Sequence, residues 1–346
     1  MDRIETLRRW VASEFPGRSP TLAPASSDAS FRRYFRLVFA DGAPSRIVMD
    51  APPGQEDCAP FVHVAGMLRA AGVNAPEVLA QDLDQGFLLL SDLGSRTYLD
   101  ALRDLRELHA DPAGADRLYR DATACLLRIQ CGAPAQSLPA YDRTLLLREL
   151  RLLPDWYIAR HHGAVLSAAQ QADLQAAFEA LVANNLAQGT VFVHRDFHSR
   201  NLMLCEPADQ RGANPGVLDF QDAVRGPVTY DLVSLLRDAY IEWEEARVLD
   251  WCIRYWEGAR AAGLPVNADF GEFYRDFEWM GLQRHLKVLG IFARLSHRDG
   301  KDAYLADLPL VLRYARRTCE RYRVFAPLLR ILDEVTGVET RTGITF

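Results

Sequence analysis

The chain has 346 residues, of which 49% are hydrophobic and 25% are charged, and its formal net charge at pH 7 is -6. It is long enough to form two lobes or domains with a large core, and its composition is that of an ordinary globular protein. The negative charge excludes a nucleic-acid-binding protein that depends on a broad basic surface, and no apolar run approaches the roughly 20 residues that span a bilayer. Lysine is rare: Lys287 and Lys301 are the two lysines among 40 lysine and arginine residues.

The six cysteines are scattered along the chain and form no C-x-x-C pair. This pattern predicts free thiols in a reducing compartment rather than disulfides or a structural zinc site. Residues 1–10 are charged and helical in pattern, unlike a signal peptide. We therefore expect a cytoplasmic protein that binds neither nucleic acid nor a membrane, and we also expect a monomer.

A helix and a strand are predicted at the start of the chain. Residues 2–14 place apolar side chains on one helical face, and Pro16-Gly17 ends this helix. Residues 31–39 alternate between apolar and polar side chains, as a strand does. The small residues 25–30 precede this strand. They form either a plain surface turn or a turn whose backbone N–H groups approach a phosphate group, as in the small lobe of a kinase.

Arg33 interrupts the apolar face of the 31–39 strand. Its side chain lies either at a solvated edge or in a phosphate-binding cleft. The next predicted strand, residues 46–50, ends in Met49-Asp50, where a protein kinase carries the lysine that holds the α- and β-phosphates. No lysine is near, so either Arg32 or Arg33 supplies the missing cation or nucleotide binding is organised differently.

The next elements complete a small lobe. A helix is predicted through residues 61–71 and is closed by Gly72, and strands are predicted at 77–80 and 87–90. The last strand leads into a short linker at Asp92-Leu93. Two lobes would join there, and backbone groups would bind adenine.

Residues 98–185 have a helical pattern. One helix is predicted over residues 145–157, and most of its leucines belong in a core. Its far end carries Trp156, Tyr157 and Arg160. These side chains either pack in the core, as large aromatics usually do, or form an aromatic and basic wall against a sugar.

The motif H-R-D-x-x-x-x-N runs from His194 to Asn201 and has the spacing of a kinase catalytic loop. In that arrangement Asp196 accepts the proton of the phosphate acceptor, and Asn201 reaches a Mg²⁺ ion that neutralises charge on the transferring phosphate. A second metal carboxylate is expected shortly downstream, after a strand. Asp219 follows such an apolar run.

The segment after Asp219 is short. Residues 220–230 separate it from Asp231 and the next predicted helix, which is too little for a folding activation loop, and no A-P-E motif follows. Both features exclude a protein kinase. In a protein kinase, the arginine of this motif binds a phosphorylated activation loop; the corresponding residue here is Arg195. It has no such partner in this sequence and is expected to be structural.

The rest of the chain is helical in pattern, with a long segment over residues 270–296. Gln283, Arg284 and His285 interrupt its apolar stripe. They either line a substrate pocket or form a satisfied polar cluster. Residues 339–346 carry no clear signal.

The motif segments resemble the aminoglycoside phosphotransferase and choline kinase superfamily, whose members phosphorylate hydroxyl groups of small molecules. The resemblance extends from residue 27 to residue 307. Within the superfamily the chain is most similar to the bacterial anomeric kinases for N-acetylmuramate and N-acetylglucosamine. The segments that carry this finer resemblance are 27–36, 49–53, 153–157, 194–201 and 218–222.

The resemblance implies an α+β, protein-kinase-like fold of two lobes. Residues 1–93 would form a small, mainly antiparallel β lobe with a helix, which binds the phosphates and adenine of ATP. Residues 94–346 would form a large, mainly helical lobe with the catalytic loop, the Mg²⁺ site and the substrate pocket. ATP and Mg²⁺ are the implied cofactors. The absent third-strand lysine fits the anomeric kinases and departs from the wider superfamily.

The resemblance also implies roles for single residues. Asp196 orients the acceptor hydroxyl and takes its proton, and Asn201 and Asp219 hold Mg²⁺. His198 either stabilises the phosphate charge, together with Arg200, or orders the loop. The remaining expected contacts are with nucleotide at Ser27, Ser30, Arg33, Asp92 and Leu93, and with the sugar at Trp156, Tyr157, Arg160, Arg200, Asp222 and Arg284.

The implied function is that of an ATP-dependent sugar 1-kinase, a phosphotransferase with an alcohol group as acceptor. Its substrate would be N-acetylmuramate, N-acetylglucosamine or both, in peptidoglycan recycling. A kinase for another small hydroxylated compound, of the aminoglycoside or choline type, is the first alternative, although the basic and aromatic candidate wall suits a neutral or carboxylated sugar better. The second alternative is an inactive nucleotide-binding scaffold. The presence of Asp196, Asn201 and Asp219 weighs against it.

Overall fold

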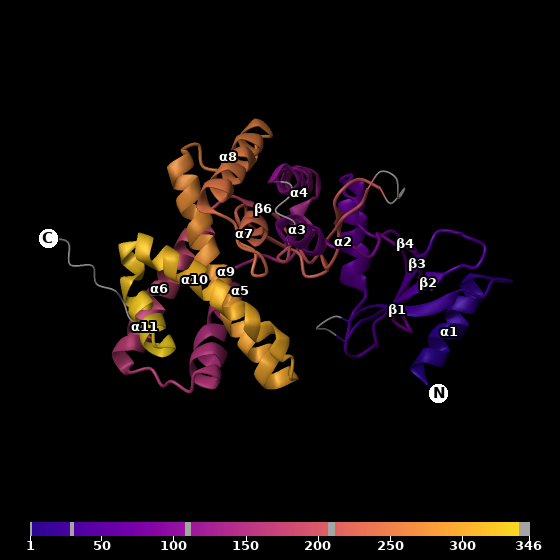
Figure 1. Cartoon of the computed structure of the whole chain (residues 1–346), viewed down its shortest axis with the longest axis horizontal. Helices are drawn as coiled ribbons and strands as arrows, with labels where there is room; N and C mark the ends of the chain where they lie inside the picture. Colours follow the sequence, from indigo (N-terminus) through magenta and orange to yellow (C-terminus); the bar gives the residue numbers. More distant parts are fainter. Residues whose placement is uncertain (1, 28–30, 108–111, 207–211, 339–346) are drawn as a thin grey trace. The chain divides into compact units, whose positions relative to one another are not determined.

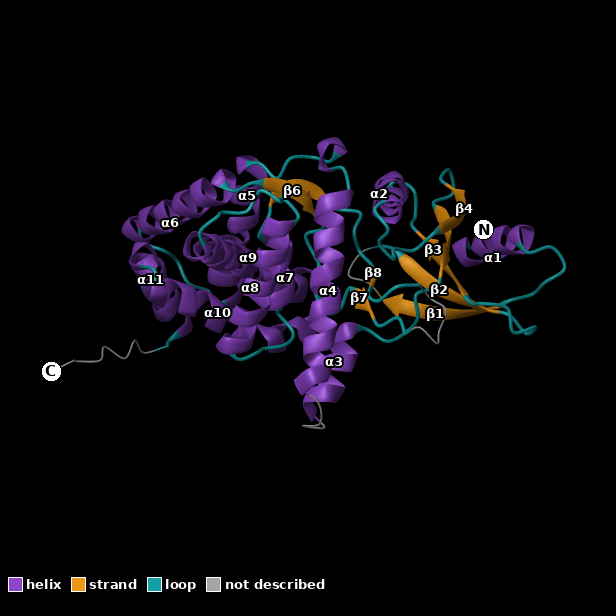
Figure 2. Ribbon diagram, turned by 90° about the horizontal axis from the view of Figure 1, so that it is seen from above, coloured by secondary structure: helices purple, strands orange, loops and turns teal. Residues whose placement is uncertain are grey.

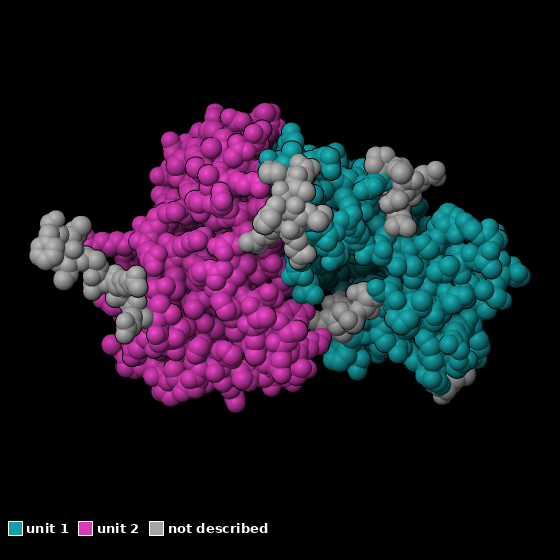
Figure 3. Space-filling model, in the orientation of Figure 1, with its two compact units in different colours: residues 1–134, 200–223 teal, residues 135–199, 224–346 magenta. Residues whose placement is uncertain are grey.

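The computed structural model describes residues 2–27, 31–107, 112–206 and 212–338. The chain divides into two compact units, which Figure 3 draws in different colours. Unit 1 consists of residues 1–134 and 200–223, and unit 2 consists of residues 135–199 and 224–346.

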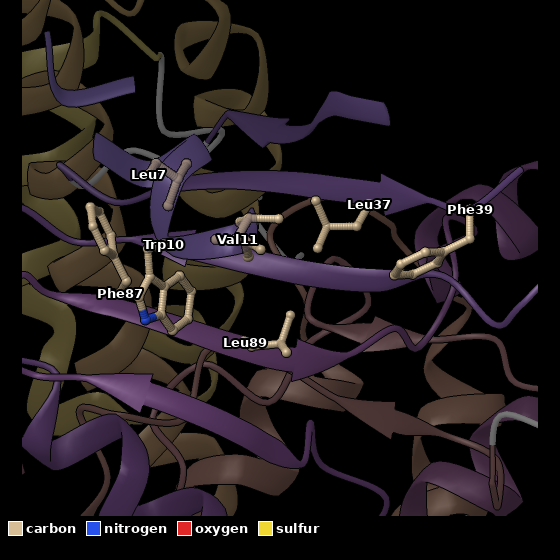
Figure 4. Packing of buried hydrophobic residues seen from close by; sticks show 8 residues of the cluster. Leu7, Trp10, Val11, Leu37, Phe39, Phe87 and Leu89 are labelled. Carbon is tan, nitrogen blue, oxygen red and sulfur yellow. The ribbon is translucent and has the colours of Figure 1, made fainter. Parts of the chain in front are cut away.

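Unit 1 contains a five-stranded antiparallel sheet in the order β1-β2-β3-β5-β4. Its strands are β1 (Thr21–Ser27), β2 (Arg33–Val38), β3 (Arg46–Asp50), β4 (Val78–Asp82) and β5 (Phe87–Ser91). The helix α1 (Arg3–Glu14) packs its apolar face on this sheet, as Figure 4 shows. The buried side chains of this core are Leu7, Trp10 and Val11 from α1, with Leu37, Phe39, Val48, Phe87 and Leu89. Asp2 caps α1 by accepting from the N–H of Ile4.

Gly86, in the turn between β4 and β5, is required by the close approach of the chain at the end of β3. Gly86 has a φ of +71°, and a Cβ atom there would lie 1.9 Å from the carbonyl oxygen of Ala51. The N–H of Ala51 donates to the carbonyl of Gly86 over 2.9 Å. This close approach joins the end of β3 to the turn, and only glycine allows it.

The segment 200–223 belongs to unit 1 through specific hydrogen bonds. It contains the short strand pair β7 (Leu202–Met203) and β8 (Gly216–Val217). Val217 donates its N–H to the carbonyl of Asn74 over 2.8 Å. The Asn214 amide donates to Tyr98 and Asp121, each over 2.7 Å. The helices of this unit besides α1 are α2 (Ala59–Ala70), α3 (Tyr98–Glu107) and α4 (Pro112–Gly132).

Unit 2 is mainly helical. Its longer helices are α5 (Arg143–Leu150), α6 (Ala168–Ala187), α7 (Tyr230–Leu236), α8 (Glu245–Ala261), α9 (Phe270–Asp299), α10 (Leu308–Arg321) and α11 (Ala326–Thr336). Short 3₁₀ turns lie at Ala135–Ser137, Asp302–Asp307 and Arg323–Phe325. Helix α9 is central: it packs against α6, α7, α8 and α10, which surround it in Figure 2, and it is buried on several faces. Two strands, β6 (Thr190–Val193) and β9 (Val224–Pro227), pair antiparallel and complete the unit. The colour gradient of Figure 1 follows these elements along the chain.

The predicted helix over residues 145–157 is two elements in the structure. Helix α5 ends at Leu150, and a π-helix, η2, follows at Leu153–His161. Pro154 has no N–H to donate to the carbonyl of Leu150, so the α-helical hydrogen-bond ladder stops there. Helix α9 packs closely on this junction, because a Cβ atom at Gly290 would lie 2.3 Å from the carbonyl carbon of Leu152.

The predicted fold class is confirmed. The antiparallel sheet with helices and the mainly helical second unit match the α+β, protein-kinase-like expectation. In the described ranges, none of the helices combines the length and apolar character needed to cross a membrane.

Candidate active site

The candidate catalytic loop begins directly after β6 in unit 2. The carboxylate of Asp231, in the first turn of α7, accepts from the backbone N–H groups of His194 and Arg195, over 2.7 and 3.0 Å. Arg195 has a φ of +78°, an unfavourable conformation for a residue with a side chain. The two N–H bonds to one buried carboxylate fix the chain just before Asp196.

The Asp231 carboxylate itself is completely buried. Burial raises its pKa, the two N–H donors lower it, and the nearby Asp196 charge raises it, giving a pKa of about 7. Asp231 therefore supports the loop, and its pKa lies close to neutral pH.

Asp196 is in a different environment, although it lies in the same loop. Its side chain is 41% exposed, and the guanidinium Nη2 of Arg284 lies 3.9 Å from its Oδ1. Burial of the loop acts to raise the pKa of Asp196, but the positive charges of Lys287, His198 and Arg284, with that of Arg195, lower it to about 2. Asp196 is therefore an ionised, accessible carboxylate.

Ser199, the last residue of the loop that belongs to unit 2, is also held by a carboxylate. Asp238 accepts from both the backbone N–H and the hydroxyl of Ser199, over 3.0 and 2.5 Å. His198 is buried, and its ring meets that of Tyr240 edge-on at 5.5 Å. The N–H of His198 donates to the carbonyl of Asp196 over 3.0 Å. This turn fixes His198 relative to Asp196.

Asn201 and Asp219 come together in unit 1. The side-chain amide of Asn201 donates to Oδ2 of Asp219 over 3.2 Å, and that of Gln221 donates to Oδ1 over 2.7 Å. Leu218 donates its N–H to the carbonyl of Asn201 over 2.9 Å, so the β7–β8 pair sets the spacing. Asp219 has a φ of +64°, a second strained conformation at a predicted site residue.

The pair formed by Asn201 and Asp219 fits a Mg²⁺ ion by its chemistry. Both residues offer oxygen ligands, and Mg²⁺ is commonly bound by one or two such protein groups together with substrate phosphates and water. Over the ranges that the structure describes, no cluster of three or more His, Cys, Asp or Glu side chains could hold a metal. The remaining ligands of a Mg²⁺ ion held by Asn201 and Asp219 would come from substrate phosphates and water.

The predicted phosphate turn is described in part. Ser27 is the last residue of β1, and its side chain is not described, while Ser30 lies outside the described residues. Arg33, in β2, donates to Asp50 of β3 over 2.5 Å, and its side chain is 49% exposed. Arg32 instead pairs with Glu56, which lies before α2, over 3.0 Å, and both side chains are largely buried.

The two predicted nucleotide-contacting residues of the linker after β5 lie in different environments. The carboxylate of Asp92 accepts from Arg36 over 2.6 Å, from Ser45 over 2.7 Å and from the N–H of Gly94 over 2.9 Å. Burial acts to raise the pKa of Asp92, but these hydrogen bonds lower it below the ordinary value. Leu93 packs in an apolar cluster whose other members are Met203, Cys205 and Leu218.

The six predicted sugar contacts are divided between the units. Trp156, Tyr157 and Arg160 lie on the π-helix η2, and Arg284 lies on α9, all in unit 2. Arg284 is brought close to Asp196, whereas the buried Tyr157 ring lies against His161 and His162. The two exposed residues Arg200 and Asp222 belong to unit 1.

The structure also shows a group of residues that the sequence analysis missed. Glu149 of α5 and Lys287 of α9 form a buried ion pair of 3.1 Å, and Glu149 also binds the guanidinium of Arg195 over 2.5 Å. Glu149 lies among leucines predicted to be core, and Lys287 lies in an apolar stripe. The one feature of the sequence that could have drawn attention to position 287 was a lysine in a chain that otherwise uses arginine almost throughout.

Residues 21–265 match the model of the Phosphotransferase enzyme family. The chain is 49% identical over 347 residues to the N-acetylmuramate/N-acetylglucosamine kinase of Neisseria meningitidis serogroup B, covering 100% of both proteins. It is 50% identical to the protein of the same name from Pseudomonas aeruginosa, covering 95% of this chain and 96% of that protein.

Solved structures resemble the fold at low sequence identity. Choline kinase LicA from Streptococcus pneumoniae superposes with a TM-score of 0.61 at 11% identity, covering 91% of this chain and 99% of that one. The ADP-bound aminoglycoside phosphotransferase APH(2'')-Ib superposes with a TM-score of 0.57 at 14% identity, covering 89% and 97%. These structures support the fold alone, whereas the family match spans most of the sequence. The chain belongs to the Phosphotransferase enzyme family.

Proposed function

We propose that this chain transfers the γ-phosphate of ATP to the anomeric hydroxyl of N-acetylmuramate and N-acetylglucosamine, as a step in the recycling of cell-wall sugars. The observation that carries the proposal is the similarity to proteins named N-acetylmuramate/N-acetylglucosamine kinase, at 49% and 50% identity over nearly the full length. The motif residues Asp196, Asn201 and Asp219 are all present for phosphoryl transfer.

Asp196 is the proposed base. It orients the acceptor hydroxyl and takes its proton late in the transfer, when the hydroxyl oxygen has begun to bond to phosphorus. An anomeric hydroxyl is more acidic than an ordinary alcohol, so a carboxylate whose pKa is lowered to about 2 still suffices. Its partial exposure lets a sugar hydroxyl reach it.

Asn201 and Asp219 are the proposed Mg²⁺ ligands. When bound, Mg²⁺ would neutralise charge on the phosphates. The amide hydrogen bonds from Asn201 and Gln221 orient the Asp219 carboxylate beforehand. This orientation reduces the reorganisation that would otherwise accompany metal binding.

His198 and Arg200 are proposed to stabilise the negative charge on the transferring phosphate. Charge stabilisation supplies most of the catalysis in phosphoryl transfer. We assign nucleotide contacts to the backbone near Ser27 and Ser30, to Arg33 and to the linker at Asp92-Leu93. The apolar cluster around Leu93 would suit the flat, apolar faces of adenine. The lobe boundary at residue 93 remains a prediction, and so do the sugar contacts at Trp156, Tyr157, Arg160, Asp222 and Arg284.

Phosphate transfer to a panel of acceptors tests the proposal. The protein is incubated with MgATP and N-acetylmuramate, N-acetylglucosamine, choline or an aminoglycoside, and the product is located by ³¹P NMR. We expect a sugar 1-phosphate. A phosphate at O6, transfer only to a cationic acceptor, or no transfer to any acceptor would each contradict the proposal.

A further inference from the structure

Behind the candidate catalytic loop, unit 2 contains a buried group of charged and hydroxyl side chains. The centre of the group is Glu149 of α5, which is 4% exposed. Its Oε1 accepts from Arg195 over 2.5 Å and lies 3.1 Å from the Nζ of Lys287. Its Oε2 accepts from the hydroxyl of Tyr141. Lys287 also donates to the hydroxyl of Tyr230 over 2.9 Å.

The group contains one carboxylate and two cations. Burial acts to lower the pKa of Lys287 and to raise that of Glu149, but the attraction between them outweighs both effects, so each remains charged. Removing Glu149 would leave both Lys287 and Arg195 in the interior without this counterion, which is far more costly than losing one surface pair.

The use of lysine at position 287 is itself informative. The chain uses arginine for nearly all its positive charges, yet this buried cation is one of its two lysines. The compact ammonium reaches both Glu149 and the hydroxyl of Tyr230, whose ring centre lies 5.6 Å from Nζ. A planar guanidinium has a different shape and hydrogen-bonding geometry, so it could not fill this position without displacing its neighbours.

This group is attached to the loop through Arg195. Arg195 immediately precedes Asp196, and its strained φ of +78° requires support from its surroundings. Asp231 binds its backbone N–H, and Glu149 binds its side chain. Asp231 of α7 thus holds the backbone of Arg195, and Glu149 of α5 holds its side chain.

We propose that Glu149 and Lys287 are positioning residues of the catalytic loop, with Glu149 serving Arg195 as a permanent counterion. Phosphorylated activation loops supply such a negative charge reversibly in protein kinases. The short segment after Asp219 leaves no room for such a loop, and the buried carboxylate makes this arrangement independent of phosphorylation. The catalytic part of the inference rests on the proposed kinase function.

The two residues act on Asp196 with opposite sign. The cations that act on Asp196 are Lys287, His198, Arg284 and Arg195. Asp231 is an acid close to Asp196, and Glu149 is the counterion of two of these cations, Lys287 and Arg195. Loss of the Lys287 charge therefore raises the proton affinity of Asp196, and loss of the Glu149 charge lowers it. A purely structural defect would not produce this difference in sign.

The first test combines kinetics with four variants: Lys287→Met, Glu149→Gln, the conservative Lys287→Arg, and Lys301→Met as the matched lysine control. We expect the first two to lower kcat by about 10–100-fold, the range for a misplaced reactive group, while the KM for ATP changes by less than about threefold. Lys301→Met should behave as wild type, and Lys287→Arg should not restore the wild-type rate. Wild-type kcat in both Lys287→Met and Glu149→Gln would overturn the inference.

The pH dependence of kcat distinguishes a change in the charge around Asp196 from general damage to the structure. In Lys287→Met the acid limb of kcat should move to higher pH than in wild type, and in Glu149→Gln it should not move upward. Acid limbs that move upward equally in both variants would contradict the opposite-sign effect.

The second test does not depend on kinase activity. Hydrogen exchange of the amides of His194 and Arg195 should be at least about 10-fold faster in Glu149→Gln than in wild type, because the loop opens locally. Exchange in the core of α11 should be unchanged, and Lys301→Met should match wild type at both places. Equal acceleration in the loop and in α11 would indicate global destabilisation and overturn the inference. If wild type transfers no phosphate to sugars, the proposed function fails while this measurement still decides the positioning role.

Discussion

The catalytic-loop motif has two parts, and the two compact units hold them by different chemistry. In unit 2, residues 194–199 are held by buried carboxylates, Asp231 and Asp238, with Glu149 binding the side chain of Arg195. In unit 1, Asn201 and Asp219 are held by side-chain amides and a short strand pair.

The difference fits the roles proposed for the two parts. The unit 2 part carries the proposed proton acceptor, and the positive charges around it lower the pKa of Asp196. The unit 1 part carries the candidate metal ligands, and neutral amides orient Asp219 without neutralising its charge. A carboxylate oriented in this way keeps its negative charge for a cation.

The strongest test of this comparison is Asp196→Asn. An amide of nearly the same shape cannot accept the proton from the sugar hydroxyl, so kcat should fall by about 10³-fold. Binding of MgATP, measured by calorimetry, should change by less than about threefold because the unit 1 residues are untouched. A wild-type rate in this variant would remove Asp196 from the mechanism.

The unit 1 part is tested by Asp219→Asn. Loss of the negative charge should lower kcat by about 100-fold and raise the Mg²⁺ concentration for half-maximal activity by at least about 10-fold. The measurement is the rate as a function of free Mg²⁺ at saturating ATP. Asp222→Asn removes an exposed carboxylate from the same segment and should leave the Mg²⁺ dependence unchanged. Equal Mg²⁺ dependence in Asp219→Asn and wild type would contradict the metal role.

Asp231 provides a test of stability rather than rate. Its pKa is raised in the folded protein to about 7, above the ordinary 3.8, so the folded state binds more protons than the unfolded state between these values. Its contribution to the free energy of unfolding is therefore present at about pH 4 and declines as the pH rises through about 7, by up to about 1 kcal/mol per pH unit.

The matched variant is Asp231→Asn, which cannot titrate and offers one carbonyl oxygen to two N–H donors. It should be less stable than wild type by about 1–3 kcal/mol at pH 5, because the NH₂ of the amide cannot accept from the second N–H, whereas the hydroxyl oxygen of the protonated acid still can. It should also lack the decline between pH 4 and 7. Urea unfolding followed by circular dichroism at several pH values measures both effects. Identical pH dependence in the two proteins would show that Asp231 does not titrate in this range.

The sequence predicted the features that depend on local spacing. The periodicity of residues 2–14, 31–39 and 87–90 is visible in a short window, and the corresponding α1, β2 and β5 form close to those positions. The order of the motif residues Asp196, Asn201 and Asp219 is likewise a local property. Their roles stay predictions until they are tested.

Features that depend on distant contacts were not predictable in the same way. Glu149 and Lys287 each sit in an apolar helical pattern, and only the packing of α5 on α9 brings their charges together. The π-helix at Leu153–His161 was expected as a continuation of α5, because periodicity does not reveal where the hydrogen-bond ladder changes. Ser27 was assigned to a turn but ends β1, since the pairing with Arg33 of β2 extends the strand.

The smallest expected effect concerns the missing third-strand lysine in unit 1. Arg32 and Arg33 are both candidates for a phosphate contact, but their ion pairs differ. Arg32 and Glu56 are largely buried together, so moving Arg32 toward a phosphate would leave Glu56 without its charged partner. Arg33 is 49% exposed and pairs with Asp50, which also has Arg3 as a partner at 2.6 Å. Arg33 can therefore turn to a phosphate while Asp50 remains paired.

This difference predicts that Arg33→Met raises the KM for ATP by about 3–10-fold and leaves kcat within about twofold, as loss of a charge-assisted phosphate contact would. Arg69→Met, which removes another partly exposed ion-paired arginine of unit 1, should leave both constants unchanged. Arg32→Met should act mainly on stability, seen as a lower urea midpoint, because it leaves Glu56 poorly paired. A larger rise in the KM for ATP with Arg32→Met than with Arg33→Met would assign the phosphate contact to the buried arginine and reverse this part of the argument.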